Sequence, residues 1–396
     1  MSTDVAALAD VRILHLFANF KWTGPADPAI RTAVHLRRLG LDVVFARATW
    51  TLPGAEHRME KELAKACLPL IGGLDLPKHF RALSLLRDRR TLSTRLRHDE
   101  FGLVHAHQPT DHLVATLAKH RAGKAGHRVR VVRTLYDPEA PPPRFRARMS
   151  FGSTDGVVVP SEAVAEAVRA RFGFPSERIL VQEPTTERRP GSGDLRVRWS
   201  LEPEHVVVGI TARIQPHRRF DLLWEVAATV VREAPHVRFV LLGRGNDEDT
   251  ERLVRAPVAQ RGLEKYVVLP GYLHEPDYSA ALRSLDAFLF LVPGSDGTCR
   301  AVREAMAVGL PVVATARGML PQILAPDAAA DAADAVPGFA VSESAEALAA
   351  SVLRLVRDPA LRRAMGAAAR AKVERAMEPV RAARRLAAFY RTLVER

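Results

Sequence analysis

Apolar and polar positions alternate along the first half of the chain in a way that separates strands from helices. Short runs of β-branched and aliphatic residues predict strands at 11–17, 41–48, 102–107, 129–136 and 155–161. A helix follows over 162–173 and ends at Gly173, a residue suited to helix C-caps. Because strands that are apolar almost throughout are buried on both faces, this pattern predicts a parallel, doubly wound sheet.

The alternation stops at residues 188–200, which are rich in Pro, Gly and Ser and lack apolar periodicity. It then resumes, and the chain is almost wholly helical from about residue 343. The expected strands of this half are 206–213, 237–243, 266–271, 286–292 and 311–316, and the expected helices are 220–233, 247–262, 277–284 and 300–308. The sequence therefore predicts an α/β protein of two tandem doubly wound, Rossmann-like domains. Ligands would bind where the carboxyl edges of the two sheets face a cleft.

Composition narrows the class of protein. The 396 residues carry a formal net charge of +13, which favours phosphorylated small molecules, anionic membranes or nucleic acid as partners. Aromatic residues make up only 6% and no nucleic-acid motif is present, so we expect no nucleic-acid partner. The acidic N-terminus, the lack of a long apolar run and the two distant cysteines lead us to expect a cytoplasmic protein.

The stretch "PGSDGTCRAVREAMAVGLPVVAT" (293–315) contains the first candidate site. Main-chain N–H groups at the start of the helix would bind an anion such as phosphate. Glu304, about one turn further in, could accept bonds from two ribose hydroxyls, and Asp296 in the turn could reach a sugar hydroxyl. Alternatively, Glu304 pairs with Arg300 at i,i+4 and Asp296 only shapes the turn.

A second candidate site lies in "GITARIQPHRRFDLLWEV" (209–226), where Arg213 and Arg218 bracket a loop between strand and helix. Two arginines so placed can hold a diphosphate through charge-assisted hydrogen bonds. The alternative is that both are ordinary surface arginines.

These motifs, in this order, resemble the donor-binding domain of GT-B fold glycosyltransferases, in particular the large retaining group that includes family 4. The matching segments are Arg213 with Arg218, "LLGRG" (241–245), "LPGYL" (269–273) and, most specifically, the stretch 293–315. Asp296 stands where that family has Glu, Cys299 where it has Gly, and Arg218 where it has Lys. The resemblance continues in "FGLVHAHQPTDH" (101–112), in "TDGVVVPSEAVAEAV" and in the C-terminal helices, so it covers nearly the whole chain.

The resemblance implies a division of the chain and a set of site residues. Residues 1–190 would form the acceptor-side domain, 191–200 a linker, 201–375 the donor-binding domain, and 376–396 a helix that crosses back to the first domain. The implied catalytic residues are His107, Asp296, Arg213 and Arg218. The implied donor-binding residues are Arg213, Arg218, Gly243, Asp296, Gly297, Thr298, Cys299, Arg300 and Glu304. Thr23 and Gly24 would form the acceptor-side loop, whereas His15 and His105 are expected to be structural.

The segment 77–102 carries many basic residues beside apolar ones. The basic residues are Lys78, Arg81, Arg87, Arg89, Arg90, Arg95 and Arg97, and the apolar ones are Phe80, Leu83, Leu86, Leu92 and Leu96. A cationic amphipathic helix of this kind suits an anionic membrane at 78–97. The alternative is a helix whose apolar side lies on the core. The segment "PPPRFRARMS" (141–150) adds further positive charge.

We therefore expect a glycosyltransferase that moves a sugar from a nucleotide-diphosphate sugar to a glycan or lipid-linked acceptor, such as a cell-surface glycan precursor. No metal site and no cofactor beyond the nucleotide-sugar co-substrate are expected, and the resemblance implies retention of anomeric configuration. Two alternatives stay open. One is a nucleotide-sugar epimerase or hydrolase on the same fold, and the other is a catalytically silent nucleotide-binding partner.

Overall fold

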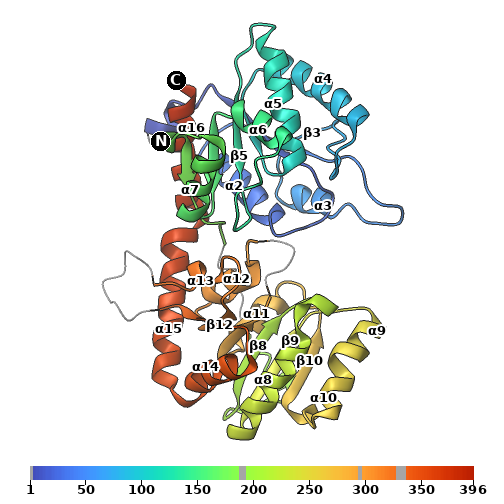
Figure 1. Ribbon diagram of the computed structural model, residues 1–396, viewed down its shortest axis with the longest axis vertical. Helices are drawn as coiled ribbons and strands as arrows, with labels where there is room; N and C mark the ends of the chain where they lie inside the picture. The colour runs from blue at the N-terminus through green and yellow to red at the C-terminus, as the bar shows by residue number, and fades with distance from the viewer. Residues whose placement is uncertain (1–2, 187–192, 293–296, 327–335) are drawn as a thin grey trace. The chain divides into compact units, whose positions relative to one another are not determined.

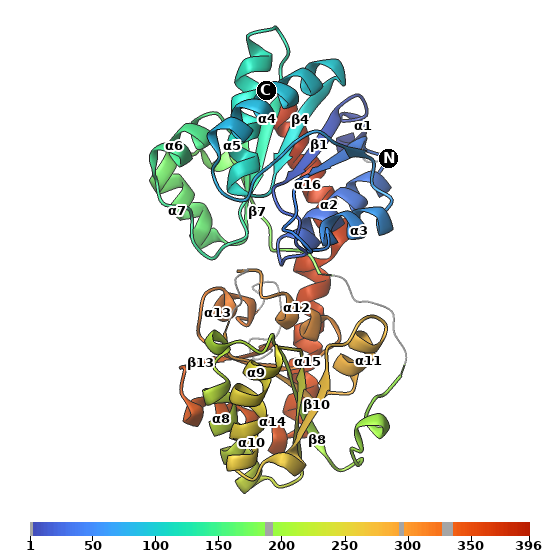
Figure 2. The ribbon, with the colours of Figure 1, turned by 90° about the vertical axis from the view of Figure 1, so that its right-hand side faces the viewer.

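The computed structural model describes residues 3–186, 193–292, 297–326 and 336–396. The chain divides into two compact units. Unit 1 comprises Met1–Thr185 and Ala376–Arg396, and unit 2 comprises Thr186–Arg375. Each unit is a parallel sheet covered by helices (Figure 1, Figure 2). The α/β architecture with two doubly wound sheets, predicted from the sequence pattern, is confirmed.

The described part of unit 1 has a seven-stranded sheet in the order β3-β2-β1-β4-β5-β6-β7, and every neighbouring pair is parallel. The strands are β1 Arg12–Phe17, β2 Val43–Arg47, β3 Leu70–Ile71, β4 Phe101–Ala106, β5 Arg130–Thr134, β6 Gly156–Val159 and β7 Ile179–Val181. From β1 the chain runs outward to β3, then returns to continue from β4 on the other side of β1. The loops that follow β1 and β4 therefore diverge, and such a switch point is where open parallel sheets bind ligands.

Helices cover both faces of the unit 1 sheet. They are α1 Thr3–Ala6, α2 Ala26–Arg38, α3 Arg58–Lys65, α4 Ala82–His98, α5 Pro109–Gly123, α6 Phe145–Gly152, α7 Glu162–Phe172 and α16 Pro379–Val394. Alternate residues of β1 enter different cores. Ile13 and Phe17 pack with α2 and α16, and Leu14 and Leu16 pack with α4 and α5. This explains why the strand presents apolar residues on both of its faces, apart from Arg12 and His15.

The last helix of the chain, α16, is part of the unit 1 core. Leu386 and Tyr390 are buried in the same apolar cluster as Ile13. Gly156 of β6 makes this close packing possible, because a Cβ there would lie 2.5 Å from Leu393 Cδ1 and 2.8 Å from Phe389 Cζ.

The described part of unit 2 has a six-stranded parallel sheet in the order β10-β9-β8-β11-β12-β13. Its strands are β8 Val206–Thr211, β9 Val237–Leu242, β10 Val267–Gly271, β11 Ala287–Phe290, β12 Val312–Thr315 and β13 Gly338–Val341. Its helices are α8 Phe220–Glu233, α9 Asp247–Thr250, α10 Ala256–Gln260, α11 Asp277–Arg283, α12 Arg300–Ala307, α13 Leu320–Ile323, α14 Ala345–Arg357 and α15 Pro359–Lys372. Here the switch point lies between β8 and β11. The loop after β8 contains the candidates Arg213 and Arg218, and Glu304 lies in α12, the helix that follows β11.

The predicted linker is only partly a linker. Residues 187–192 lie outside the described residues, but the segment that follows is bound to unit 2. Arg196 donates from Nη2 to Asp286 Oδ2 at 2.6 Å and from Nε to the Ser284 carbonyl at 3.0 Å. Leu195 N also donates to Ser284 Oγ at 2.8 Å. The Pro, Gly and Ser content of this stretch did not reveal that one arginine would anchor it.

Candidate active site

The arginine loop of unit 2 connects β8 to α8 and crosses the switch point. Arg218 ends a short 3-10 turn, Pro216–Arg218, and its Nη1 donates to the Val292 carbonyl at 3.3 Å. Val292 lies just beyond β11, so this bond ties the two diverging loops together. Arg213 is exposed, two residues after the end of β8. Both predicted arginines therefore lie at the carboxyl edge of the sheet, where a diphosphate would need them.

Gly243, predicted to bind the donor, shapes this loop through its main chain. A Cβ at Gly243 would lie 1.8 Å from the Ala212 carbonyl oxygen, so the end of β9 approaches the arginine loop at main-chain distance. Ile214 N donates to the Arg244 carbonyl at 3.0 Å and continues this contact. Glycine is thus required here because of the position of Ala212, next to Arg213.

The start of α12 is the second part of the unit 2 site. Asp296 lies outside the described residues, and Gly297 and Thr298 lead into the helix. Cys299 caps the helix with φ 48° and is buried. A positive φ favours glycine, which explains why the resembling family has Gly at this position. The first main-chain N–H groups of α12 follow directly, beside Arg300.

Two contacts of Glu304, with Arg300 and with Tyr278, bear on its position. Its Oε1 lies 3.6 Å from Arg300 Nε, so the i,i+4 pair considered for the sequence does occur. Its Oε2 accepts a hydrogen bond from Tyr278 Oη at 3.0 Å. The Glu304 side chain is only 11% exposed. Sequence analysis missed Tyr278, because no motif or periodicity distinguishes it and only the fold brings α11 to α12.

In unit 1 the loops after β1 and β4 are tied together by a buried carboxylate. Asp111, in the first turn of α5, accepts bonds from Ala18 N at 3.0 Å and from Gln108 N at 2.7 Å. Burial raises the pKa of Asp111 to about 7, although the Arg133 guanidinium 3.9 Å away opposes this shift. Thr23 and Gly24 lie further along the first loop, just before α2. Asp111 and Arg133 were not singled out in the sequence.

His107, predicted to be catalytic, directly follows β4 and is only 1% exposed. Its Nε2 lies 2.9 Å from His15 Nδ1, and its Nδ1 lies 2.7 Å from Tyr136 Oη. The His107 ring also stacks on His105, with the ring centroids 4.4 Å apart. His15 and His105, predicted to be structural, thus belong to the same buried cluster.

The electrostatics of this histidine cluster follow from its burial. Desolvation lowers the pKa of His15 to about 3 and lowers the pKa values of His105 and His107 well below the ordinary value. All three rings are therefore neutral at physiological pH. His105 is held by hydroxyl groups on both sides, with Nε2 2.6 Å from Thr134 Oγ1 and Nδ1 bonded to Tyr390 Oη.

The histidine cluster is also the group among the described residues that could hold a metal ion. One ligand nitrogen from each of the three rings lies within 4.8 Å of the others. However, the planes of His105 and His107 are inclined by only 15°, so their lone pairs lie in separate, nearly parallel planes. A metal needs lone pairs that converge on one point, so the rings would have to turn before they could bind one.

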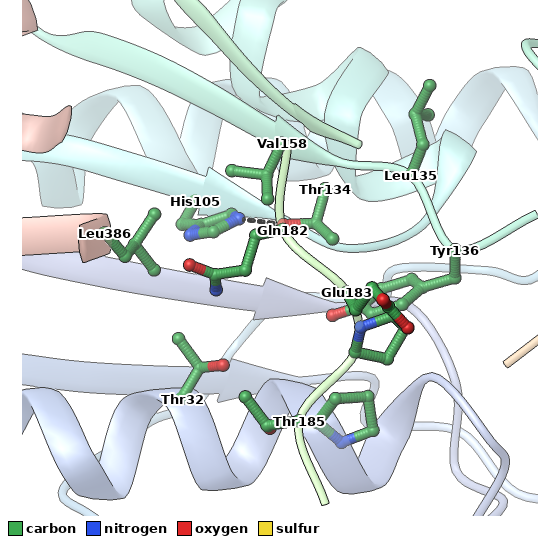
Figure 3. A pocket seen from close by; sticks show the side chains of 12 residues that line it. Thr32, His105, Thr134, Leu135, Tyr136, Val158, Gln182, Glu183, Thr185 and Leu386 are labelled. Atoms are coloured by element: carbon green, nitrogen blue, oxygen red, sulfur yellow. Dashed lines mark hydrogen bonds between the residues drawn. The ribbon is translucent and has the colours of Figure 1, made fainter. Parts of the chain in front are cut away.

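A small polar pocket adjoins the histidine cluster. Figure 3 shows Gln182 beside the His105–Thr134 hydrogen bond, and Leu386 of α16 on the other side of His105. Buried oxygen atoms of Gln182 and Thr185 face this region without a hydrogen-bond partner among the described residues. The pocket has the polar lining that an ordered water requires.

Among the described residues, no helix has the length and apolar content required to cross a lipid bilayer.

Comparison with known proteins assigns both units to families. Residues 194–372 match the family "Glycosyl transferases group 1", and residues 29–184 match "Glycosyltransferase Family 4". The chain therefore belongs to the GT-B fold glycosyltransferases. More particularly, its second unit belongs to group 1 and its first unit to family 4.

Individual relatives are distant. The chain is 27% identical over 247 residues to the D-inositol 3-phosphate glycosyltransferase of Rhodococcus erythropolis. This alignment covers 56% of this chain and 54% of that enzyme. It is 26% identical over 322 residues to the enzyme of the same name from Actinosynnema mirum. That alignment covers 74% of this chain and 75% of the relative. The first of these alignments thus spans only about half of the curated relative's length.

Among solved structures, Anabaena Alr3699/HepE in complex with UDP matches with a TM-score of 0.75 at 19% identity. The match covers 95% of this chain and 98% of that one. At this identity the likeness establishes the fold, and the reaction has to be argued from the site.

Proposed function

We propose that this protein transfers a sugar from a nucleotide-diphosphate sugar to a hydroxyl group of an acceptor. The observation that carries the proposal is the Arg218–Val292 bond, which joins the loops after β8 and β11 at the switch point of unit 2. Two arginines and the first N–H groups of α12 meet the requirements of a diphosphate there. In this proposal Glu304 accepts bonds from the ribose hydroxyls, which its partly buried carboxylate near the start of α12 supports.

The proposed reaction breaks the bond between the anomeric carbon of the sugar and the diphosphate oxygen. A new bond forms between that carbon and the acceptor oxygen, the acceptor's hydroxyl proton passes to the departing diphosphate oxygen, and a nucleoside diphosphate leaves. Arg213, Arg218 and the α12 N–H groups stabilise the charge that develops on the leaving diphosphate. Asp296 contacts the sugar, and no metal or further cofactor takes part. Retention of configuration is part of the proposal and rests on the family resemblance.

Unit 1 has the acceptor role in this proposal. Thr23, Gly24 and His107 belong to the loops at its own switch point, which supports a second ligand site there. Because His107 is neutral, it would act as a hydrogen-bond partner of a sugar hydroxyl. To do so it would give up its bond to either His15 or Tyr136. The names of the relatives suggest an inositol phosphate as the first acceptor to assay.

A thermal-shift screen with UDP-, GDP-, ADP- and dTDP-sugars tests donor binding. A binder at 100 times its dissociation constant would stabilise the protein by about 2.7 kcal/mol. The UDP bound in the Anabaena structure makes UDP-sugars the first to try. Failure of every nucleotide sugar to stabilise the protein would contradict the proposal.

Turnover with donor alone separates the alternatives. Appearance of an epimer or of free sugar without acceptor would indicate an epimerase or hydrolase. Donor binding without turnover across a broad acceptor panel would indicate a catalytically silent partner. Glycoside formation that depends on acceptor supports the transferase.

We also propose that residues 78–97 contact an anionic membrane, and that the acceptor is lipid-linked. Only the first part of α4 supports this contact. Leu83 is 81% exposed and Leu86 is 45% exposed, whereas Leu92 and Leu96 are fully buried and pack in the core. The first part of this helix therefore fits a membrane contact. Its second part fits the alternative, a helix whose apolar side lies on the core.

A neighbouring helix extends this exposed surface. Phe145, the first residue of α6, is 80% exposed, and the Arg146 guanidinium lies 3.5 Å from the centroid of the Phe80 ring. Arg81, Arg144 and Arg148 are exposed in the same two segments. Large apolar side chains among arginines are typical of surfaces that bind anionic lipid headgroups.

Sedimentation with liposomes tests the membrane contact. We expect binding to vesicles that contain phosphatidylglycerol at low salt, release at high salt, and little binding to pure phosphatidylcholine. Leu83→Ser with Phe145→Ser should weaken binding, whereas Leu52→Ser, a change at another exposed leucine, should not. No binding of the unmodified protein at low salt would remove this part of the proposal.

A further inference from the structure

Tyr278 connects three elements of the unit 2 site through one hydroxyl group. It is the second residue of α11, and its Oη lies 3.0 Å from Glu304 Oε2 on α12. The same Oη lies 3.5 Å from Thr211 Oγ1, at the end of β8. Two residues beyond Thr211, the chain reaches Arg213.

The direction of the Tyr278–Glu304 bond follows from the chemistry of its partners. An ionised carboxylate only accepts hydrogen bonds, so the single phenolic proton is donated to Glu304. A bond to a charged acceptor is stronger than one between neutral groups, which favours Glu304 over the more distant Thr211. One carboxylate oxygen is thereby held in a defined direction, toward α11.

The protonation state of Tyr278 supports this donor role. Burial, followed by the nearby Glu304 charge, raises the pKa of Tyr278 well above the ordinary value of 10. The phenol therefore keeps its proton throughout the pH range of an assay.

We propose that Tyr278 is a positioning residue, which orients Glu304 for the two ribose hydroxyls of a nucleoside diphosphate and so sets selectivity for an intact ribose. This inference rests on the proposed function, since it assigns a nucleotide to the unit 2 site. A carboxylate has about four lone-pair positions, so Glu304 can keep the Tyr278 bond while it accepts bonds from a ribose. Tyr278 itself need not touch the nucleotide.

The test measures binding of UDP and of 2′,3′-dideoxy-UDP by calorimetry, for the unmodified protein and for Tyr278→Phe. We expect Tyr278→Phe to weaken UDP binding about five- to tenfold, the size of one ordinary hydrogen bond, because Glu304 stays in place but is held less well. Binding of the dideoxy analogue should stay unchanged, because it has no ribose hydroxyls for Glu304 to hold. In a Glu304→Ala background, Tyr278→Phe should have no further effect on UDP binding.

Tyr266→Phe is the matched control, because this tyrosine stands just before the amino end of β10, at the opposite edge of the unit 2 sheet from the candidate site. It should leave binding of both ligands unchanged. An equal loss for UDP and the dideoxy analogue would show that Tyr278 only supports the fold, and unchanged UDP binding would show that it has no role; either result overturns the inference. If the unmodified protein binds none of UDP, GDP, ADP and dTDP, the proposed function itself fails.

Discussion

At the scale of single residues, Arg213 and Arg218 differ in a way that can be measured. Both are proposed to contact the diphosphate, but only Arg218 also donates to the Val292 carbonyl. We expect either alanine variant to lose about 2–4 kcal/mol of transition-state stabilisation, seen as a drop in kcat/KM. Arg218→Ala should also lower the melting temperature, because it unties two loops, whereas Arg213→Ala should not.

Arg232→Ala is the control for both arginines, since Arg232 is exposed near the end of α8. It removes one positive charge from the same unit without touching the switch point. If Arg232→Ala reduced kcat/KM as much as the other two, the effect would reflect net charge. Near-normal turnover by either Arg213→Ala or Arg218→Ala would contradict its proposed role.

Gly243 gives a second prediction at this scale. Because a Cβ at this position would lie 1.8 Å from the Ala212 carbonyl, Gly243→Ala must push the arginine loop away from β9. We expect a loss of about 1–3 kcal/mol in unfolding free energy, as for other overpacked sites. Donor affinity should fall as well, since Arg213 moves with Ala212.

Urea unfolding and donor titration measure the two effects of Gly243→Ala. Gly152→Ala serves as control, because a Cβ there meets nothing within 4 Å. Unchanged donor affinity in a destabilised Gly243→Ala protein would mean that the arginine loop does not bind the donor.

At the scale of elements, the sequence predicted those that carry a strong pattern. The helix expected at 220–233 has the bounds of α8, and the five strands expected in each half are present. The strands β3, β7 and β13 were missed because they have only two to four residues, too few to carry a clear periodicity. The helix α5 was missed because it is buried on several sides, with polar Asp111 and His112 among its apolar residues.

The candidate site was predictable only where its residues lie in one continuous motif. Arg213, Arg218 and Glu304 stand in such motifs, and the structure places them at the switch point of unit 2. Tyr278 and Asp111 come from elsewhere in the chain, and only tertiary packing brings them to the loops that they hold. A single tyrosine or aspartate has no local pattern that could have identified it.

The helix α16 gives the prediction that belongs to this scale. It is distant in sequence from the rest of unit 1, yet Leu386 is 1% exposed in the unit 1 core. Leu386→Ala should lower the free energy of unfolding by about 2–4 kcal/mol, since a buried leucine is replaced by a cavity. Leu52→Ala, at a leucine that is 51% exposed, should change it by less than about 0.5 kcal/mol. Equal effects of the two variants in urea unfolding would show that α16 does not stabilise unit 1.

At the scale of the whole molecule, each unit has its own sheet with its own switch point, and each switch point is built differently. In unit 2 the loops carry arginines around a proposed diphosphate site, tied together by Arg218. In unit 1 the loops are tied by Asp111, and neutral buried histidines lie beside them. This difference suits one unit that binds the diphosphate of the leaving group and another that presents neutral hydrogen-bonding groups to the hydroxyl groups of an acceptor, and it gives the two units different responses to acid.

The buried histidines predict how the stability of unit 1 depends on pH. Burial lowers the pKa values of His15, His105, His107 and His112, so the folded protein keeps these rings neutral where the unfolded chain would protonate them. Below about pH 6.5 the unfolded chain therefore binds more protons, and the unfolding free energy falls by up to about 1.4 kcal/mol per pH unit for each histidine.

Asp111 acts with the opposite sign, because its pKa is raised to about 7 and its stabilising contribution is lost as the pH rises through that value. Asp88 acts in the same sense as Asp111, because burial also raises its pKa. The four histidines outweigh these two carboxyl groups and give a net loss of stability in acid, which urea unfolding between pH 7.5 and 5 would measure. His112→Gln, which can still bond to Thr154 through its amide, should reduce the slope by about one quarter of the four-histidine contribution, and a pH-independent unfolding free energy would contradict the neutral cluster.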